Sequence, residues 1–75
     1  MNPQELSKGI LKYLLDHDRS GESQLPEAKQ IAEHLGADVL DVIDQLDILE
    51  AKGAVELAYG MGSRESMGAW IKPIR

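Results

Sequence analysis

The sequence predicts an α+β domain in which three helices are followed by a two-stranded hairpin. Apolar residues recur at helical spacing in three segments, near residues 3–17, 27–35 and 39–52. Only Gly36 and Ala37 separate the second of these segments from Asp38, which suits the start of the third. After Gly53 the apolar residues no longer keep the helical period, and two candidate strands follow at 54–59 and 67–74.

The third helix is the best-defined element. Asp38 is a good N-cap, and Asp41 lies in the first turn, where an acidic side chain suits the positive end of a helix. Gly53 ends the helix, with Lys52 in its last turn. The residues between share one apolar stripe, formed by Val39, Val42, Ile43, Leu46 and Leu49.

The first two helices also carry end signals. Asn2 caps the first helix, which we expect to end near residues 16–17, before a polar turn around Gly21. Leu25, the one apolar residue of this turn, is expected to anchor it to the core, and with its neighbour Gln24 it is a candidate for a very short strand. The second helix begins at residue 26 or 27. The short turn after it forces helices two and three to cross steeply.

The predicted hairpin carries a long loop at residues 60–68, which we expect to be mobile because it holds three glycines and several polar side chains. Pro73 cannot donate to a strand ladder, which places the second strand at a sheet edge or near its own end. Trp70 either covers the helices from the sheet side or joins Tyr59, Met61 and Met67 in an exposed apolar surface.

The composition bounds the function classes. Seventy-five residues make one small domain, residues 1–75, with 13 acidic and 8 basic side chains and a net charge of −5. This acidity counts against a general nucleic-acid binder, which usually carries a basic face. The chain has no cysteine, and no apolar run approaches the roughly 20 residues of a membrane span. We therefore expect a cytoplasmic protein with no membrane partner.

Several short motifs together resemble a known family. They are Ile31-Ala32, Leu35-Gly36, the spaced residues Val42, Leu46 and Leu49, and the closing run Lys52-Gly53-Ala54-Val55. This pattern is similar to that of the winged helix-turn-helix superfamily, and the similarity covers nearly the whole chain. The resemblance implies a three-helix bundle with a helix-turn-helix, followed by a β-hairpin called the wing. The superfamily includes DNA-binding regulators and protein-interaction modules.

In the DNA-binding members, the third helix enters the major groove and the wing touches the DNA backbone or minor groove. The groove-facing positions here would be Val39, Leu40, Asp41, Asp44 and Ile48. The resemblance implies Ser, Thr or Arg at these places, and an aspartate repels a phosphate. A DNA-binding transcriptional regulator therefore stands as the alternative prediction, with contacts from Arg64 in the wing and from Lys8 and Lys12 in the first helix.

The leading hypothesis is a protein-interaction or regulatory adaptor module. The outer side of the third helix combines acidic and apolar side chains, namely Leu40, Asp41, Asp44, Asp47 and Ile48. Acidic groups would orient a partner, and the two apolar groups would supply buried contact, with another protein or a second copy as the partner. Two alternatives stay open: the acidic residues form a solvated face, or the wing or helix one partly covers Leu40 and Ile48.

The sequence carries no catalytic, cofactor or metal motif. His17 and His34 are the only histidines, without further ligands at matching spacing. Asp16 and Asp18 are acids with no sign of a pocket around them, and the glycines of residues 60–63 lie in a hairpin, whereas phosphate-cradling loops join a strand to a helix. We expect a protein that is not an enzyme and that needs no cofactor.

Overall fold

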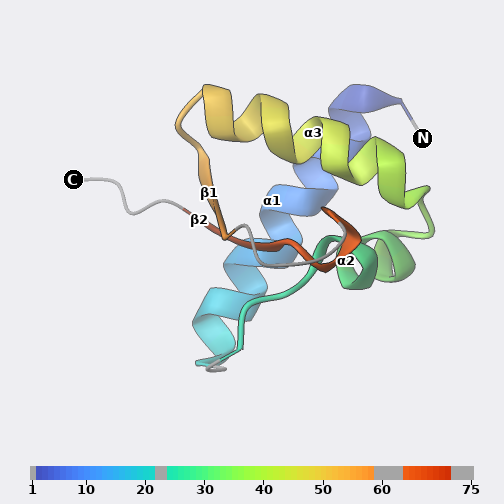
Figure 1. Ribbon diagram of the computed structural model, residues 1–75. Coiled ribbons are helices and arrows are strands. Elements are labelled where there is room, and N and C mark those ends of the chain that lie inside the picture. Colours follow the sequence, from blue (N-terminus) through green and yellow to red (C-terminus); the bar gives the residue numbers. More distant parts are fainter. Residues whose placement is uncertain (1, 22–23, 59–63, 72–75) are drawn as a thin grey trace.

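The computed structural model describes residues 2–21, 24–58 and 64–71, and these form three helices followed by a two-stranded antiparallel hairpin (Figure 1). The elements are α1 (Pro3–Ser20), α2 (Ala28–Leu35), α3 (Val39–Ala51), β1 (Val55–Ala58), the 3₁₀ turn η1 (Arg64–Ser66) and β2 (Gly68–Ile71). The arrangement is α+β and winged-helix-like, which confirms the predicted fold class.

Helix α1 is longer than predicted. It begins as expected, because the backbone N–H of Glu5 donates to the side chain of Asn2 at 2.8 Å. The predicted end near residue 17 is wrong, since the helix continues through Asp18 and Arg19 to Ser20. It ends where Gly21 takes a left-handed conformation with φ of 74°. Gly21 therefore ends the helix, and the polar residues before Gly21 form the exposed last turn of α1.

Helices α2 and α3 match their predicted ranges to within one or two residues. Glu27 is the N-cap of α2, and its backbone N–H donates to the side chain of Gln30 at 2.8 Å. Gly36 closes α2 in the left-handed conformation with φ of 66°. Asp38 then caps α3 by accepting a hydrogen bond from the backbone N–H of Leu40 at 2.8 Å. The tight connection between the two helices therefore rests on the residues that predicted it.

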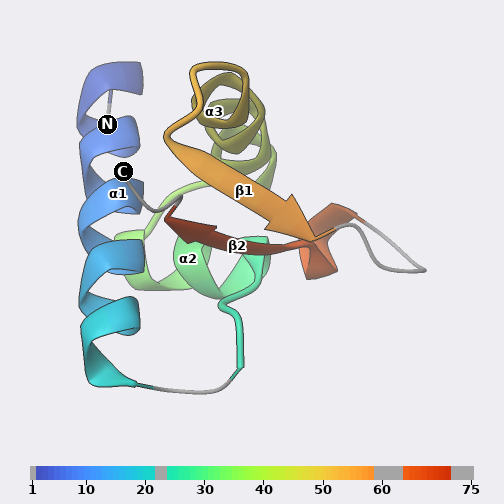
Figure 2. The same ribbon diagram turned by 90° about the vertical axis from the view of Figure 1, so that its left-hand side faces the viewer.

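The hairpin pairs β1 with β2 in antiparallel register, from Val55 opposite Ile71 to Ala58 opposite Gly68. Both strands are shorter than predicted within the described residues. Residues 59–63 and 72–74 of the predicted strands and loop lie outside the described residues. In Figure 2 the hairpin lies between α3 and α2. Residues 64–66 of the predicted loop form η1, directly before β2.

A third segment lies against the other edge of β2. Glu27 forms a single antiparallel bridge with Gly68. The backbone N–H of Ala69 donates to the carbonyl of Pro26 at 3.1 Å, and that of Ala28 donates to the carbonyl of Met67 at 3.0 Å. The predicted short strand at residues 24–25 is therefore displaced to Glu27. At this point β2 is paired on both sides, whereas Pro73, on which the expectation of a strand edge or strand end rested, lies outside the described residues.

The core lies between the three helices and the inner face of the hairpin. Its buried side chains are Leu6, Ile10, Leu14, Ala28, Ile31, Ala32, Val42, Ile43, Leu46, Leu49, Val55, Leu57, Met67 and Ala69. The predicted stripe of α3 is thus buried from Val42 to Leu49, with Val39 packed at the margin. Burial of this stripe fixes which side of α3 faces outward.

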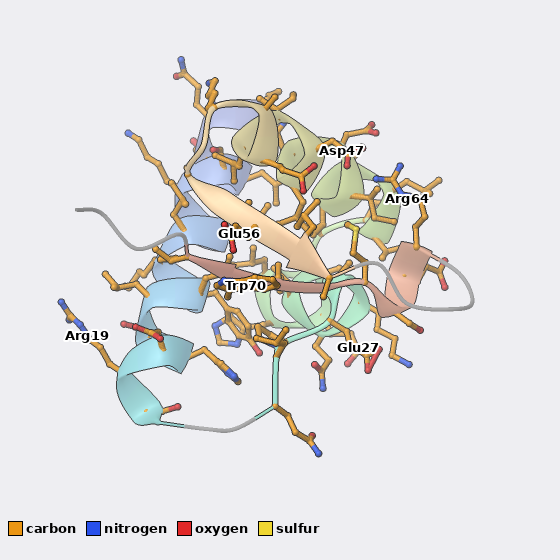
Figure 3. The ribbon with its side chains drawn as sticks, turned by 60° about the vertical axis from the view of Figure 1, so that its left-hand side comes forward. Arg19, Glu27, Asp47, Glu56, Arg64 and Trp70 are labelled. Carbon is orange, nitrogen blue, oxygen red and sulfur yellow. The ribbon has the colours of Figure 1, made fainter. Side chains whose placement is uncertain are left out.

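Two apolar residues for which the sequence suggested a place in the core lie outside it. Trp70 is only half-buried, and because side chains alternate along a strand, it lies on the face of β2 opposite to the buried Ala69. It pairs across the hairpin with Glu56 (Figure 3). Leu25 is 43% exposed and packs beside Gly68, so the prediction that it anchors the loop in the core is wrong.

Candidate functional site

The candidate site is the outer face of α3, which comprises Leu40, Asp41, Asp44, Asp47 and Ile48. Leu40 is 64% exposed and Ile48 is 44% exposed. Asp41 and Asp44 are also exposed, and Asp47 is partly exposed. Within the described residues, both apolar side chains keep part of their surface in contact with solvent, and Leu40 keeps most of it. The alternative of partial cover by helix one holds for Ile48, which lines a hollow with Ser7 and Lys8 of α1.

Helix geometry sets how these residues are grouped. Leu40, Asp44 and Ile48 lie at positions i, i+4 and i+8, which form one stripe about 12 Å long at 1.5 Å per residue. Asp44 therefore sits between the two exposed apolar side chains. At roughly 100° per residue, Asp41 lies on one flank of this stripe and Asp47 on the other, about 120° apart. The five predicted residues thus form a central stripe with an acid on each side.

One flank of this face contacts the end of the wing. The guanidinium Nη2 of Arg64 lies 2.5 Å from Oδ1 of Asp47, and Figure 3 shows Arg64 extending from η1 toward Asp47. Both side chains remain partly exposed, at 52% for Arg64 and 39% for Asp47. The structure therefore pairs the arginine predicted to contact nucleic acid with an aspartate predicted to contact a protein. This ion pair holds the described end of the wing against α3.

The other flank of α3 faces α1. Lys8 shares a surface hollow with Ile48 and Lys52, and Lys12 shares the neighbouring hollow with Lys52. Lys52 lies about 140° around the helix from Asp47 at roughly 100° per residue. The lysines of α1 and Arg64 therefore lie on opposite sides of α3, with the exposed Asp44 between them. The three predicted nucleic-acid contacts are not brought together.

Sequence reasoning overlooked Gln45 and gave Lys52 only a helix-capping role. Both line the junction between α1 and α3. A signal was present on α1, where Lys8, Leu11, Lys12 and Leu15 follow the i, i+3, i+4, i+7 spacing of a second amphipathic stripe. Leu15 is 38% exposed and Leu11 is partly buried. This stripe is basic and apolar, whereas the outer face of α3 is acidic and apolar.

The two histidines contact a tyrosine between α1 and α2. The ring of Tyr13 lies 4.7 Å from that of His34 and 6.4 Å from that of His17, measured between ring centroids. Nε2 of His17 lies 2.6 Å from the carbonyl oxygen of Gln24, which ties the loop after α1 back to the helix. Within the described residues, no three His, Asp or Glu side chains gather closely enough to hold a metal ion.

Two broader findings bear on the class of protein. None of the helices in the described part of the chain combines the length and apolar character that a membrane span requires. No protein-family model matches this chain, and no curated protein sequence matches it either.

Proposed function

We propose that this domain is a protein-interaction module with a regulatory adaptor role, and that its partner binds the outer face of α3. One observation carries the proposal: Leu40 and Ile48 are exposed on a single stripe of α3 and are surrounded by acids. Exposed apolar groups gathered on one helix face are typical of surfaces that contact another chain. The proposed role is binding and involves no catalysis.

The exposed apolar area gives a rough magnitude for the contact. Fully burying a Leu or Ile side chain stabilises a complex by about 1.5–3 kcal/mol. Leu40 has 64% of its surface available and Ile48 has 44%, so together they offer about 2–3 kcal/mol. Because 1.4 kcal/mol is about tenfold in affinity, the pair accounts for roughly 30–150-fold of binding. A complex of moderate affinity is the expected result.

The acids define the chemistry of the partner. Asp41 and Asp44 are exposed beside the two apolar side chains. Charges at the rim of an interface speed association and select partners of opposite charge more than they add affinity. The partner surface should therefore be apolar at its centre, to meet Leu40 and Ile48, and basic at its margin.

Among winged-helix modules, this arrangement favours protein over DNA as the partner of α3. Membership of that superfamily is part of the proposal, and the fold class and the sequence motifs support it. Phosphate binding would need cations on the face presented to the duplex, and here Asp44 occupies the centre of that face. Arg64 already contacts Asp47. A cytoplasmic location is also part of the proposal, and a sequence without cysteine is compatible with it.

Photo-crosslinking inside cells tests the proposal. A benzophenone amino acid is placed at position 40, and a matched control carries it at position 33, which is exposed on α2. We expect a covalent protein adduct from position 40 only, weakened by a second substitution, Asp44→Lys. A nucleic-acid adduct from position 40, or adducts no stronger than those from position 33, would overturn the proposal.

A further inference from the structure

Three surface hollows adjoin one another along the junction of α1 and α3. The first is lined by Asp41, Asp44 and Gln45 together with Pro3 and Leu6. The second shares Pro3 and Gln45 with the first, and adds Ile48, Lys8 and Lys52. The third shares Lys52 with the second, and continues over Lys12 to Leu11, Leu15, Ala54 and Ile71. The shared lining residues show that the three hollows form one continuous surface, named here the α1–α3 seam.

The α1–α3 seam changes charge from one end to the other. Asp41 and Asp44 make the first end acidic, while Lys8, Lys12 and Lys52 make the other end basic. Ile48 lies near the middle, and the apolar side chains of Leu11, Leu15 and Ile71 continue the basic end. Three of the 8 basic residues of a chain with net charge −5 therefore gather on this surface. The seam is thus an apolar strip with opposite charges at its two ends.

We propose that the occupant of the α1–α3 seam is a second copy of this chain, related by a two-fold axis. A two-fold interface is formed by the same surface on both copies, so the surface must be complementary to itself. The seam meets this condition, because in a two-fold dimer the acidic end of each copy faces the basic end of the other. Ile48 then lies close to the axis, where its exposed side chain is covered by the second copy.

This inference rests on the proposed function, since it names the partner of the Ile48 side of α3. It leaves Leu40 accessible, because Leu40 lies about 120° around the helix from Lys52 at roughly 100° per residue. The dimer would therefore present two copies of Leu40 to further partners. Photo-crosslinking from position 40 in the chain with Lys8→Glu and Lys12→Glu, whose substitutions lie outside α3, therefore reports on Leu40 apart from dimerisation through the seam.

Charge reversal at each end of the seam gives a direct test by sedimentation equilibrium. One variant carries Asp41→Lys and Asp44→Lys, which makes both ends basic. The other carries Lys8→Glu and Lys12→Glu, which leaves Lys52 as the one described lysine at that end. We expect the wild-type chain to dimerise, and each variant alone to dissociate with a dimer Kd raised by at least about tenfold. Mixed in equal amounts, the two variants should form a 1:1 heterodimer, because their ends are then complementary.

Matched controls separate this result from loss of fold. Glu33→Lys reverses an exposed charge on α2, away from the seam, and should dimerise like the wild type. Circular dichroism melts check that each variant is folded, and Asp44→Lys alone replaces the acidic-end variant if the double substitution unfolds. Any of four results would overturn the two-fold proposal. The wild-type chain could stay monomeric, the single variants could still dimerise, their mixture could stay monomeric, or assemblies could grow beyond dimers. A monomeric wild type that still gives a protein adduct from position 40 would overturn the dimer and leave the proposed function standing.

Discussion

The same substitution at two positions of α3 separates its core side from its outer side. Leu46 is fully buried, at 0% exposure, whereas Leu40 is 64% exposed on the same helix. Replacing each with Ala removes the same atoms and leaves a good helix former in both places. The difference in the free energy of unfolding between the two variants therefore measures how differently the two sides of α3 are packed.

The expected magnitudes follow from those exposures. Removing a buried Leu side chain costs its transfer free energy and leaves a cavity, so Leu46→Ala should cost about 2–5 kcal/mol. Leu40 buries only about a third of its surface, so Leu40→Ala should cost less than about 1 kcal/mol on the scale of 1.5–3 kcal/mol for full burial. A domain of this size has a total stability of roughly 4–11 kcal/mol, so the first loss is severe and the second is minor.

Urea unfolding followed by circular dichroism gives both values under the same conditions. The slope of free energy against urea concentration should stay constant across the series, so that shifts in the midpoint report stability alone. A Leu40→Ala variant as unstable as Leu46→Ala would show that Leu40 is buried in solution. In that case the outer face of α3 could not serve as a docking surface.

Three further predictions follow from the same structure. Gly36→Ala should lower the free energy of unfolding in urea by about 1–2 kcal/mol, because an L side chain is strained at φ of 66°. A variant as stable as the wild type would show that the turn between α2 and α3 adjusts freely. A double-mutant cycle on Arg64→Ala and Asp47→Ala should give a coupling free energy of unfolding below about 1 kcal/mol. This coupling should shrink at high salt, since both side chains are partly exposed. A larger coupling that does not depend on salt would point to a buried pair. Random duplex DNA should bind weakly or not at all at physiological salt, in a fluorescence anisotropy titration; sub-micromolar affinity with a steep salt dependence would favour the DNA-binding alternative.

The helix boundaries were predictable where a single residue sets them. Gly36 and Asp38 act through their own backbone conformation and side chain, so the turn between α2 and α3 could be read locally. The end of α1 was misplaced because the polar residues from Asp18 to Ser20 resemble a loop in composition. Their exposure costs nothing in a last helical turn, and the helix ends only where Gly21 takes the left-handed conformation.

The strand pairings that involve distant segments could not be predicted from local patterns. The bridge between Glu27 and Gly68 joins segments that are far apart in the chain, and neither residue is typical of a strand. The faces of β2 were also ambiguous, because Ala69 and Trp70 are both apolar neighbours. The pairing with β1 turns Ala69 inward beside Leu57 and leaves Trp70 half-buried on the other face.

The sequence predicted which residues of α3 share the candidate site, but it did not predict which residues of other elements contact them. Helical spacing alone places Leu40, Asp44 and Ile48 on one stripe, and their exposure agrees with it. The contact between Arg64 and Asp47 depends on how the wing returns to α3, across 17 positions of the chain. Likewise, only the packing of α1 against α3 brings Lys8 and Lys52 to the same hollow.

The double substitution Leu40→Lys with Ile48→Lys tests the docking surface most directly. The assay is isothermal titration calorimetry of each chain with the protein recovered by crosslinking from position 40. The control is Leu25→Lys, because Leu25 lies outside α3 and is about as exposed as Ile48. We predict that the double variant loses at least about fivefold in affinity, since loss of the Leu40 contact alone removes about 1–2 kcal/mol, and that the control binds like the wild type. Unchanged affinity in a double variant that circular dichroism shows to be folded would contradict the assignment of α3 as the docking surface.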